Sequence, residues 1–383
     1  MKTDNEPKAP IIWSTTLLLL LTPIISVVGG IWYQIAYGFE WYHFAAFVFM
    51  AAITGISITG GYHRLWAHKA YSANIVVRWF FALFGAANYQ NSILVWASQH
   101  RRHHFFVDDN DKDPYSANKG LWFSHVGWLL RDYPNNKDDF TNCKDLQKDP
   151  VVVIQHKYYF TIAFLMNIVP PLLLGAITGD YIAFFLTMAM MKLVYTHHTT
   201  FFINSLAHFW GKRPYTTENT ARDNGMLAFF TYGEGYHNYH HKFQNDYRNG
   251  IRWYQYDPTK WMIRVFSVLG LAKDLKRTPN IKIREAMVKR QLERATETLA
   301  TNQKYQALSE YVEKEAAQFA QTMTEWKQTQ SKWFALQRGK LESAKQDLRQ
   351  NMENSVVSSR MKELEYTVLM QYQRLRQFNA GLA

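Results

Sequence analysis

Near the N-terminus the chain contains a long stretch without a charged side chain. It begins after Lys8, ends before Glu40 and contains the run IIWSTTLLLLLTPIISVVGGIWYQIAYGF. About 20 consecutive apolar residues are enough for a helix to cross the hydrocarbon core of a bilayer. The run is longer than the apolar part of a secretory signal peptide, and it lacks a small-residue cleavage site after a basic start. It therefore predicts a transmembrane helix near residues 11–36.

Three more apolar stretches predict further transmembrane helices. They lie near residues 41–62, 160–179 and 181–204, and the last is interrupted by a single charged residue, Lys192. Inside lipid a helix satisfies its own backbone hydrogen bonds, which makes it a suitable spanning structure. We therefore predict an all-α polytopic membrane protein with four transmembrane helices.

The distribution of Lys and Arg predicts the orientation in the membrane. The links at residues 39–40 and 179–180 contain neither residue type, whereas residues 64–157 contain twelve and residues 211–383 contain 28. Lys and Arg accumulate in the cytoplasmic loops of membrane proteins. Both large loops and both termini are therefore expected to be cytoplasmic, with the net charge of +12 also attracting anionic lipid headgroups.

Other compositional features exclude some classes of partner and linkage. A single cysteine, Cys143, excludes an intramolecular disulfide and agrees with a reducing compartment. Nothing in the chain resembles a nucleic-acid recognition motif, so we expect no nucleic acid partner. The composition instead predicts that the protein contacts membrane lipid.

Nine of the fourteen histidines fall in four short motifs, GGYHRLWAH, QHRRHH, NSLAH and EGYHNYHH. Helical residues three and four apart share a face, so HRRHH and HNYHH can each direct three imidazoles to one point, and Asn204 lines up with its partner in NSLAH in the same way. The first two histidines are five apart, about 140° around an ideal helix, and are expected to serve different metals or to flank a helix end. The nine are His63, His68, His100, His103, His104, His208, His237, His240 and His241.

Burying so many imidazoles without a shared cation would leave many polar groups to satisfy, so the pattern predicts a metal centre, with two ions indicated. Neutral imidazole suits iron, copper, zinc and nickel. Soluble di-iron bundles use two Glu-x-x-His pairs and two further Glu ligands, whereas these motifs contain one such spacing, from Glu234 to His237, and no second pair. Glu234 lies nearby in the sequence and is expected to orient a ligand imidazole.

The apolar stretch 73–98 is ambiguous because Asn88, Gln90 and Asn91 interrupt it. A full span here would place HRLWAH and HRRHH on opposite sides of the membrane. One metal centre needs both on the same side, so we predict an in-plane or re-entrant helix.

After Pro279 the composition changes to Glu, Lys, Gln, Arg and Ala, which are good helix formers. Residues 280–383 are therefore predicted to form a helical cytoplasmic extension. Its apolar positions are too irregular for a clear heptad pattern, so a helical hairpin, a partner-binding arm and a solvated helix all stay open.

The histidine motifs resemble the three histidine boxes and the extra Asn/His pair of the membrane fatty acid desaturases, specifically the stearoyl-CoA Δ9 desaturase group, bacterial type. DKDP, FSHVGWLL and LQKDPVVVIQHKYY extend the resemblance to roughly residues 10–275. It implies a membrane domain of residues 1–275 in which a cytoplasmic helical cap, residues 63–157 and 205–275, holds a di-iron site.

The resemblance also implies which residues do the work. Two irons would be bound by the nine histidines, with Asn204 acting through a water and O₂ as co-substrate. Ser98-Gln99 and Asp132 stand where the family has further headgroup-binding charges. The implied substrate contacts are Gln90, Trp96 and Thr200 at a bend in the acyl tunnel, Ala51 and Gly55 at its closed end, and Asn91 and Arg131 near the headgroup. Ala51 is smaller than the family's aromatic residue, so we expect a deeper tunnel.

The expected activity is O₂-dependent desaturation of a long-chain fatty acyl-CoA at the Δ9 position. Acyl carrier protein or an intact phospholipid stays open as acyl donor, and a lipid hydroxylase, a metal sensor or transporter, and a scaffold stay open as functions. The sequence contains neither the HPGG of a fused haem domain nor G-x-G-x-x-G, so we expect a separate electron carrier of the ferredoxin, rubredoxin or cytochrome b5 type with its reductase. The expected location is the bacterial inner membrane.

Overall fold

The computed structural model describes residues 9–301, 308–342 and 348–382. Residues 1–8 and 383, the chain ends whose cytoplasmic location is predicted above, lie outside this description. The chain divides into two compact units. The first comprises Met1–Arg213 and Glu218–Arg277, and the second comprises Pro214–Thr217 and Thr278–Ala383.

Three helices in the described part of the chain are long and apolar enough to cross a membrane. They cover Trp13–Ala36, Trp41–Ala67 and Tyr159–Thr178, close to three of the four predicted spans. The protein therefore has the helices expected of a membrane protein. In order, they consist of α1 (Trp13–Ile24) with α2 (Gly30–Ala36), α3 (Trp41–Ile56) with a π-helical extension, and α8 (Tyr159–Thr178).

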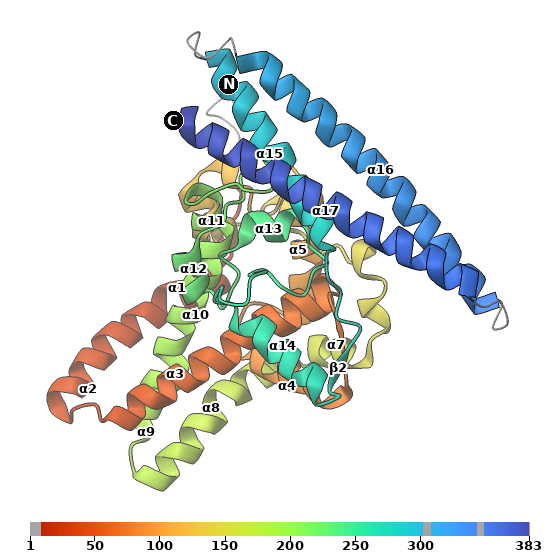
Figure 1. The fold of residues 1–383 in the computed structure, drawn as a ribbon. Coiled ribbons are helices and arrows are strands. Elements are labelled where there is room, and N and C mark those ends of the chain that lie inside the picture. Colours follow the sequence, from red (N-terminus) through yellow and green to blue (C-terminus); the bar gives the residue numbers. More distant parts are fainter. Residues whose placement is uncertain (1–8, 302–307, 343–347, 383) are drawn as a thin grey trace. The chain divides into compact units, whose positions relative to one another are not determined.

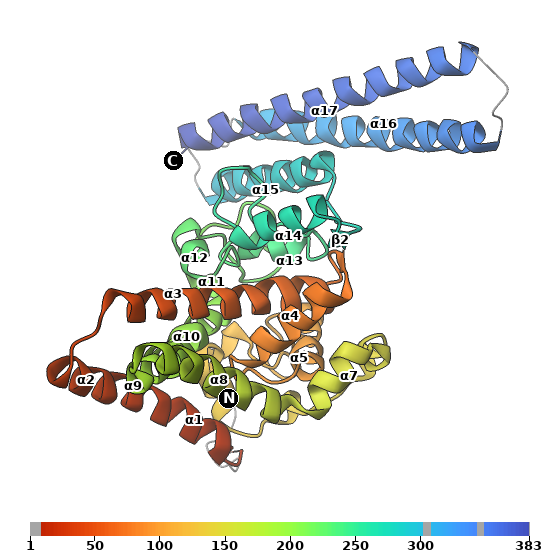
Figure 2. The same ribbon diagram turned by 90° about the horizontal axis from the view of Figure 1, so that it is seen from below.

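The fourth predicted span is one continuous helix, made of α9 (Tyr181–Phe184), a π-helical segment and α10 (Lys192–Asn204). It is less apolar than the other three because it carries Lys192, His197 and His198. Its middle contacts α3, α8 and the π-helical segment Ile25–Gly29 that joins α1 to α2, and Figures 1 and 2 show these helices side by side. The crossing of a membrane by this fourth helix stays a prediction.

The ambiguous stretch 73–98 forms two short helices, α4 (Ile75–Ala86) and α5 (Ile93–Phe106). α4 has twelve residues, fewer than the roughly 20 that cross a bilayer. α4 packs closely on the helix that continues α3, because a Cβ added at Gly85 would lie 2.3 Å from the ring of Tyr62. A glycine at this position allows the two helices to approach.

Buried polar groups hold the loop between α4 and α5. The Lys192 ammonium donates hydrogen bonds to the Ala87 carbonyl at 2.7 Å and to Asn167 Oδ1 at 2.8 Å. Tyr89 and Asn91 in this loop have positive φ angles of 50° and 71°, which non-glycine residues adopt rarely. A buried ammonium is tolerated only when its donors have partners. Lys192 lies on α10 and finds one of these partners in the loop, so the hydrogen bond to Ala87 connects the loop to α10.

The remaining elements of the first unit are short. β1 (Ser72–Ala73) pairs antiparallel with β2 (Ala272–Lys273), and the rest of the regular structure is helical. The largest apolar core lies where the helix that continues α3 meets α4 and α5. The other helices are α6 (Trp128–Leu130), α7 (Pro150–Lys157), α11 (Leu206–Phe209), α12 (Gly225–Phe230), α13 (His237–Lys242) and α14 (Pro258–Val268).

The second unit contains three long helices with a core of their own, where the sequence left a hairpin, an arm and a solvated helix open. They are α15 (Asn280–Thr301), α16 (Ser309–Glu342) and α17 (Leu348–Leu382), and α17 contacts both others. Apolar burial between helices stabilises such an assembly even without a regular heptad repeat. The buried core is formed by Ile281, Val288, Phe319, Met323, Trp326, Leu364, Val368 and Leu375.

Replacing Trp326 with Ala should loosen the second unit. The side chain is 3% exposed, and truncating a buried Trp costs about 3–5 kcal/mol through lost burial and the cavity left behind. Hydrogen–deuterium exchange on the full chain should show reduced protection in α15, α16 and α17. Phe334→Ala on the same helix, where the side chain is 52% exposed, is the matched control. Equal protection in the two variants would contradict the assigned core.

Candidate metal centre

The nine clustered histidines come together in the first unit from separate parts of the chain. His63 lies in the π-helical segment after α3, and His68 follows its end. α5 and α13 carry three each, and α11 carries one. The ring nitrogens form two groups, and within each group the ligand atoms all lie within 4.8 Å of one another. The first group is His63, His68, His100, His104 and His240, and the second is His103, His208, His237 and His241.

Within each group the Nε2 atoms face one another. Two unprotonated nitrogens at hydrogen-bond distance repel, whereas a cation between them makes each lone pair a ligand. The arrangement therefore fits metal ligation better than a purely structural role. The Nε2–Nε2 distances are 3.0 Å for His63–His240, 3.0 Å for His104–His240, 2.8 Å for His68–His100, 3.2 Å for His208–His237 and 3.1 Å for His237–His241.

The expectation that HRRHH directs three rings to one point is wrong. His100 and His104, four residues apart, share the first group, while His103 belongs to the second. Neighbouring residues on a helix lie about 100° apart, so His103 and His104 face different points. HNYHH divides in the same way, since its pair four residues apart stays together. HRRHH and HNYHH thus each supply imidazoles to both groups.

The expectation that His63 and His68 serve different metals is wrong, because both rings belong to the first group, with centroids 4.7 Å apart. The alternative, that the two residues flank a helix end, agrees with the position of His68 just after the helix. The cause of the shared group is the π-helical segment Ser57–Ala67. The His68 amide donates to the His63 carbonyl at 3.0 Å, five residues back. Such i→i+5 bonding brings residues five apart toward one face of the helix. The 140° angle of an ideal α-helix does not apply here.

Asn204 and His208 do not lie on one unbroken helix, contrary to the expectation from NSLAH. α10 ends at Asn204, Ser205 interrupts the helix, and His208 lies in α11. His208 nevertheless reaches the second group, while Asn204 lines a neighbouring cavity. A role for Asn204 as a ligand through water stays a prediction.

Carboxylates hold two of the rings from outside. His63 Nδ1 lies 3.0 Å from Glu234 Oε2, and His103 Nδ1 lies 2.9 Å from Asp113 Oδ1. A neutral imidazole has one N–H, and when Nδ1 donates it to a carboxylate, the Nε2 lone pair is left for a metal. Both contacts therefore orient the rings toward the group interior, and Glu234 occupies the orienting position predicted for it.

Glu234 belongs to a buried charged network. Arg64 Nη2 lies 2.9 Å from Glu234 Oε1 and 3.0 Å from Asp257 Oδ1, and each of these three side chains is at most 2% exposed. Burial alone would raise the pKa of Glu234, but the adjacent His63 and Arg64 outweigh it and lower that pKa. The carboxylate is therefore ionised and accepts the His63 N–H.

Seven of the nine imidazoles are held in the neutral form. Burial lowers the pKa of each well below its usual value, and the neighbouring histidines lower it further. Metal binding needs deprotonated ligands, and neutral imidazoles suit first-row transition metals, so the residues fit two metal ions. The seven are His68, His100, His104, His208, His237, His240 and His241.

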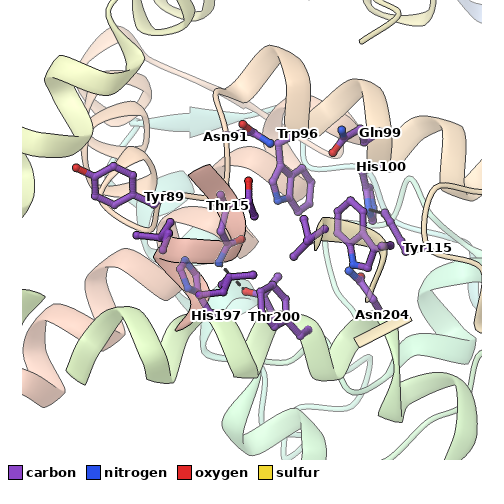
Figure 3. A pocket seen from close by; sticks show the side chains of 16 residues that line it. Thr15, Tyr89, Asn91, Trp96, Gln99, His100, Tyr115, His197, Thr200 and Asn204 are labelled. Atoms are coloured by element: carbon purple, nitrogen blue, oxygen red, sulfur yellow. Dashed lines mark hydrogen bonds between the residues drawn. The ribbon is translucent and has the colours of Figure 1, made fainter. Parts of the chain in front are cut away.

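A cavity of about 120 Å³ opens beside the first group. His100 forms part of its wall with Trp96, whose ring stacks on the imidazole at a centroid distance of 4.8 Å. Gln90 Nε2 donates to Thr200 Oγ1 at 3.0 Å, and both residues line the same cavity. Figure 3 shows Trp96 and Thr200 directed into one space, with His100 and Asn204 on one side of it. The cavity thus leads to the first histidine group.

Other residues predicted to contact substrate are more scattered. Asn91 lines the cavity beside His100, and Gly55 lines a second cavity of about 10 Å³. The two cavities share Gln90 and Thr200 in their walls. Ala51 is buried on α3 and lines neither cavity. Substrate contact at each of these positions stays a prediction.

The predicted headgroup residues also lie apart. Arg131 lines neither cavity, and its guanidinium donates to the Ala9 carbonyl at 2.7 Å. Gln99, which stands where the family has a charge, lines the larger cavity and donates to Asn136 Oδ1 at 2.9 Å. A contact between Arg131 and a substrate headgroup therefore stays a prediction.

Several residues at the centre were not singled out from the sequence. Asp113 lies in the DKDP segment, whose resemblance to the family was the available signal. Thr220 Oγ1 lies 2.7 Å from His208 Nδ1, and the Tyr115 hydroxyl lies 3.2 Å from His100 Nδ1. No spacing rule marks these hydroxyls, because each is brought to its ring by the fold.

Comparison with known proteins gives one family. Residues 39–270 match the model of the family described as fatty acid desaturase. Similar curated proteins include the probable acyl-CoA desaturase of Schizosaccharomyces pombe, 44% identical over 238 residues (62% of this chain and 50% of that protein). Acyl-CoA desaturase 1 of Saccharomyces cerevisiae is 40% identical over 284 residues (73% and 54%). Delta(9)-fatty-acid desaturase fat-7 of Caenorhabditis elegans is 35% identical over 278 residues (70% and 80%).

The chain spans about half the length of the two yeast relatives. All three relatives come from eukaryotes, so they give no support to the bacterial type expected from the sequence.

Replacing His240 with Ala should lower the metal content. Its Nε2 atom lies 3.0 Å from those of both His63 and His104, so its loss removes a ligand at the middle of the first group. The metal content of the purified full chain, measured by elemental analysis, should fall from about two ions per chain to about one. The reason is that the lost ligand lowers the metal affinity of the first group and leaves the second group complete. His156→Ala, an exposed histidine outside both groups, is the control. Unchanged metal content in His240→Ala would refute the grouping.

Replacing Asp113 with Asn should weaken metal binding without removing a ligand. The amide cannot accept the His103 N–H with a full negative charge, and loss of such an outer partner costs about 10–100-fold in metal affinity. Chelator competition on the purified protein measures this change. Asp111→Asn, exposed in the same loop, should behave as the unmodified protein. Equal affinities for the two variants would show that Asp113 does not orient the ligand.

Proposed function

Because the chain belongs to the fatty acid desaturase family, we propose that it introduces a cis double bond into a saturated long-chain acyl group. The observation that carries this proposal is the cavity that brings His100, a member of the first histidine group, to a wall shared with Trp96, Gln90 and Thr200. A cavity of this kind gives a hydrocarbon chain access to the metal-binding groups. The proposed substrate is an acyl-CoA, desaturated at the Δ9 position.

We propose that the nine histidines bind two irons and that Asn204 contributes through a water. When bound, the iron pair would supply the redox chemistry in which O₂ takes two electrons from a carrier, two protons from the solvent, and two hydrogens with their electrons from the substrate, forming two waters. The two histidine groups and the lowered pKa of seven of their imidazoles support this assignment.

The protein's own contribution is to place two adjacent carbons of the chain beside His100. Trp96 lies flat against that imidazole at 4.8 Å, so a chain passing the indole is held next to the ligand. The Gln90–Thr200 hydrogen bond forms a polar barrier that a hydrocarbon must bend around. Restricting the reacting carbons to one position accounts for regioselectivity, because a positioned group reacts far faster than a mobile one.

The acyl donor is proposed from two lines of support. The names of the relatives refer to acyl-CoA, and the chain carries a net charge of +12, which favours a phosphorylated headgroup. Ser98, Gln99 and Asp132 replace charges that the family uses, which leaves acyl carrier protein and phospholipid as outcomes for the assay to decide.

Electrons are proposed to come from a separate carrier of the ferredoxin, rubredoxin or cytochrome b5 type. Its docking side would be the cytoplasmic cap, residues 63–157 and 205–275, because the histidine groups lie there. The Lys and Arg distribution supports a cytoplasmic cap. Residues 280–383 would form an extension outside the enzymatic domain of residues 1–275. A bacterial inner membrane stays the expectation from the sequence alone.

The deciding assay offers stearoyl-CoA, stearoyl carrier protein and stearoyl phospholipid to the purified, iron-loaded full chain with a reconstituted electron donor. Mass spectrometry of the products should show a monounsaturated chain from stearoyl-CoA, and His103→Ala should yield none. Product from phospholipid alone would overturn the acyl-CoA assignment. A hydroxylated chain in place of an alkene would overturn desaturation itself.

A further inference from the structure

The turn before the third histidine box contains a bulky residue in an unusual conformation. Tyr232 has a φ of 55°, which is uncommon for any residue other than glycine and rarer for large side chains. The Thr259 hydroxyl donates to its carbonyl at 3.0 Å and helps to hold this conformation. Such conformations persist only where surrounding contacts impose them, and they concentrate at functional sites.

This conformation directs the Tyr232 ring against α3 at Gly55. A Cβ added to Gly55 would lie 2.2 Å from Tyr232 Cε2 and 2.6 Å from its Cζ. Any larger residue at Gly55 would therefore displace the ring. The Tyr232 hydroxyl donates to the Ala51 carbonyl at 2.9 Å and is hydrogen-bonded to Tyr195. Backbone packing and two hydrogen bonds fix the ring.

The ring also lies along the path that a bound chain would take. Tyr232 and Gly55 line the smaller cavity, and Gln90 and Thr200 line both cavities. A chain that extends from His100 past the Gln90–Thr200 pair therefore reaches the smaller cavity next. That cavity has only about 10 Å³, roughly the space of one water.

Because of this arrangement, the small residues Ala51 and Gly55 on α3 do not leave open space beside them. Ala51 predicted a deeper tunnel, because it is smaller than the aromatic residue that the family has at this position. The Tyr232 ring takes up space at Gly55 from the opposite side and is bonded to the backbone at Ala51. The space beside these two small residues is thus occupied by a side chain about 180 positions away in the sequence.

We propose that Tyr232 closes the end of the acyl-binding space and limits the length of the chain that the enzyme accepts. The proposal rests on the proposed function, because it assigns the end of the same acyl site. It predicts that shortening this side chain admits longer chains without affecting the histidine groups.

The test compares stearoyl-CoA with arachidoyl-CoA, which is two methylenes longer, on the purified full chain. Competition against radiolabelled stearoyl-CoA measures binding without turnover, and product analysis measures desaturation of both. Each methylene that becomes buried is worth about fourfold in affinity. In Tyr232→Ala the ratio of arachidoyl-CoA to stearoyl-CoA affinity should therefore rise at least about fourfold over the unmodified protein, with the metal content unchanged.

Two controls separate a length limit from general damage. Tyr232→Phe keeps the ring and loses only the hydroxyl, so its length ratio should equal that of the unmodified protein. Tyr254→Ala truncates a tyrosine that is 57% exposed and lines neither cavity, and its ratio should also be unchanged. If Tyr232→Ala does not fold, Tyr232→Asn replaces it, because Asn tolerates the left-handed conformation.

The outcomes distinguish this proposal from the proposed function. A folded Tyr232→Ala or Tyr232→Asn protein with an unchanged length ratio overturns the role of Tyr232 and leaves the desaturase assignment intact. An unmodified protein that binds neither acyl-CoA and forms no unsaturated product overturns both.

Discussion

The close approach of nine mostly buried imidazoles is the constraint on which the rest of the first unit depends. Nitrogen atoms that face one another at 2.8–3.2 Å fit a shared cation, and the rings must be held from behind for the lone pairs to converge. Carboxylates and hydroxyls do this at His63, His100, His103 and His208. The rings come from four separate segments between residues 63 and 241. The helix that continues α3 must therefore meet α5, α11 and α13 at one place.

Helical irregularities make this meeting possible. A π-helical segment after α3 brings His63 and His68 into one group, and the interruption at Ser205 lets His208 leave the direction of α10. Regular helices would have directed these side chains elsewhere. π-Helical turns often occur at functional sites, which agrees with the segment between Ser57 and Ala67. Of the three long apolar helices, only Trp41–Ala67 carries one of the nine histidines, His63, which lies near its end.

Buried polar contacts extend from the centre toward the cavity. Lys192 holds the loop that carries Gln90, and Gln90 in turn bonds to Thr200 on α10. Further along, Tyr232 packs against Gly55 and bonds to the carbonyl of Ala51. A small side chain on one helix therefore does not by itself mean open space, because a large one from a distant turn can fill it. The shape of the proposed acyl site is therefore determined by several segments together.

Residue type and local pattern were sufficient for the chemistry of the centre. Clustered histidines near uncharged apolar runs predicted a membrane protein with a metal centre, because imidazole nitrogens are good ligands and such runs are long enough to span lipid. The sequence could not predict that His103 and His104 belong to different groups, or that His63 and His68 belong to the same one. Both facts depend on the local form of the helix and on where its neighbours lie. The same holds for Asp113 and Tyr232, whose partners are distant in sequence. Spacing describes one segment at a time, whereas a ligand group and the end of a cavity are formed where several segments pack together.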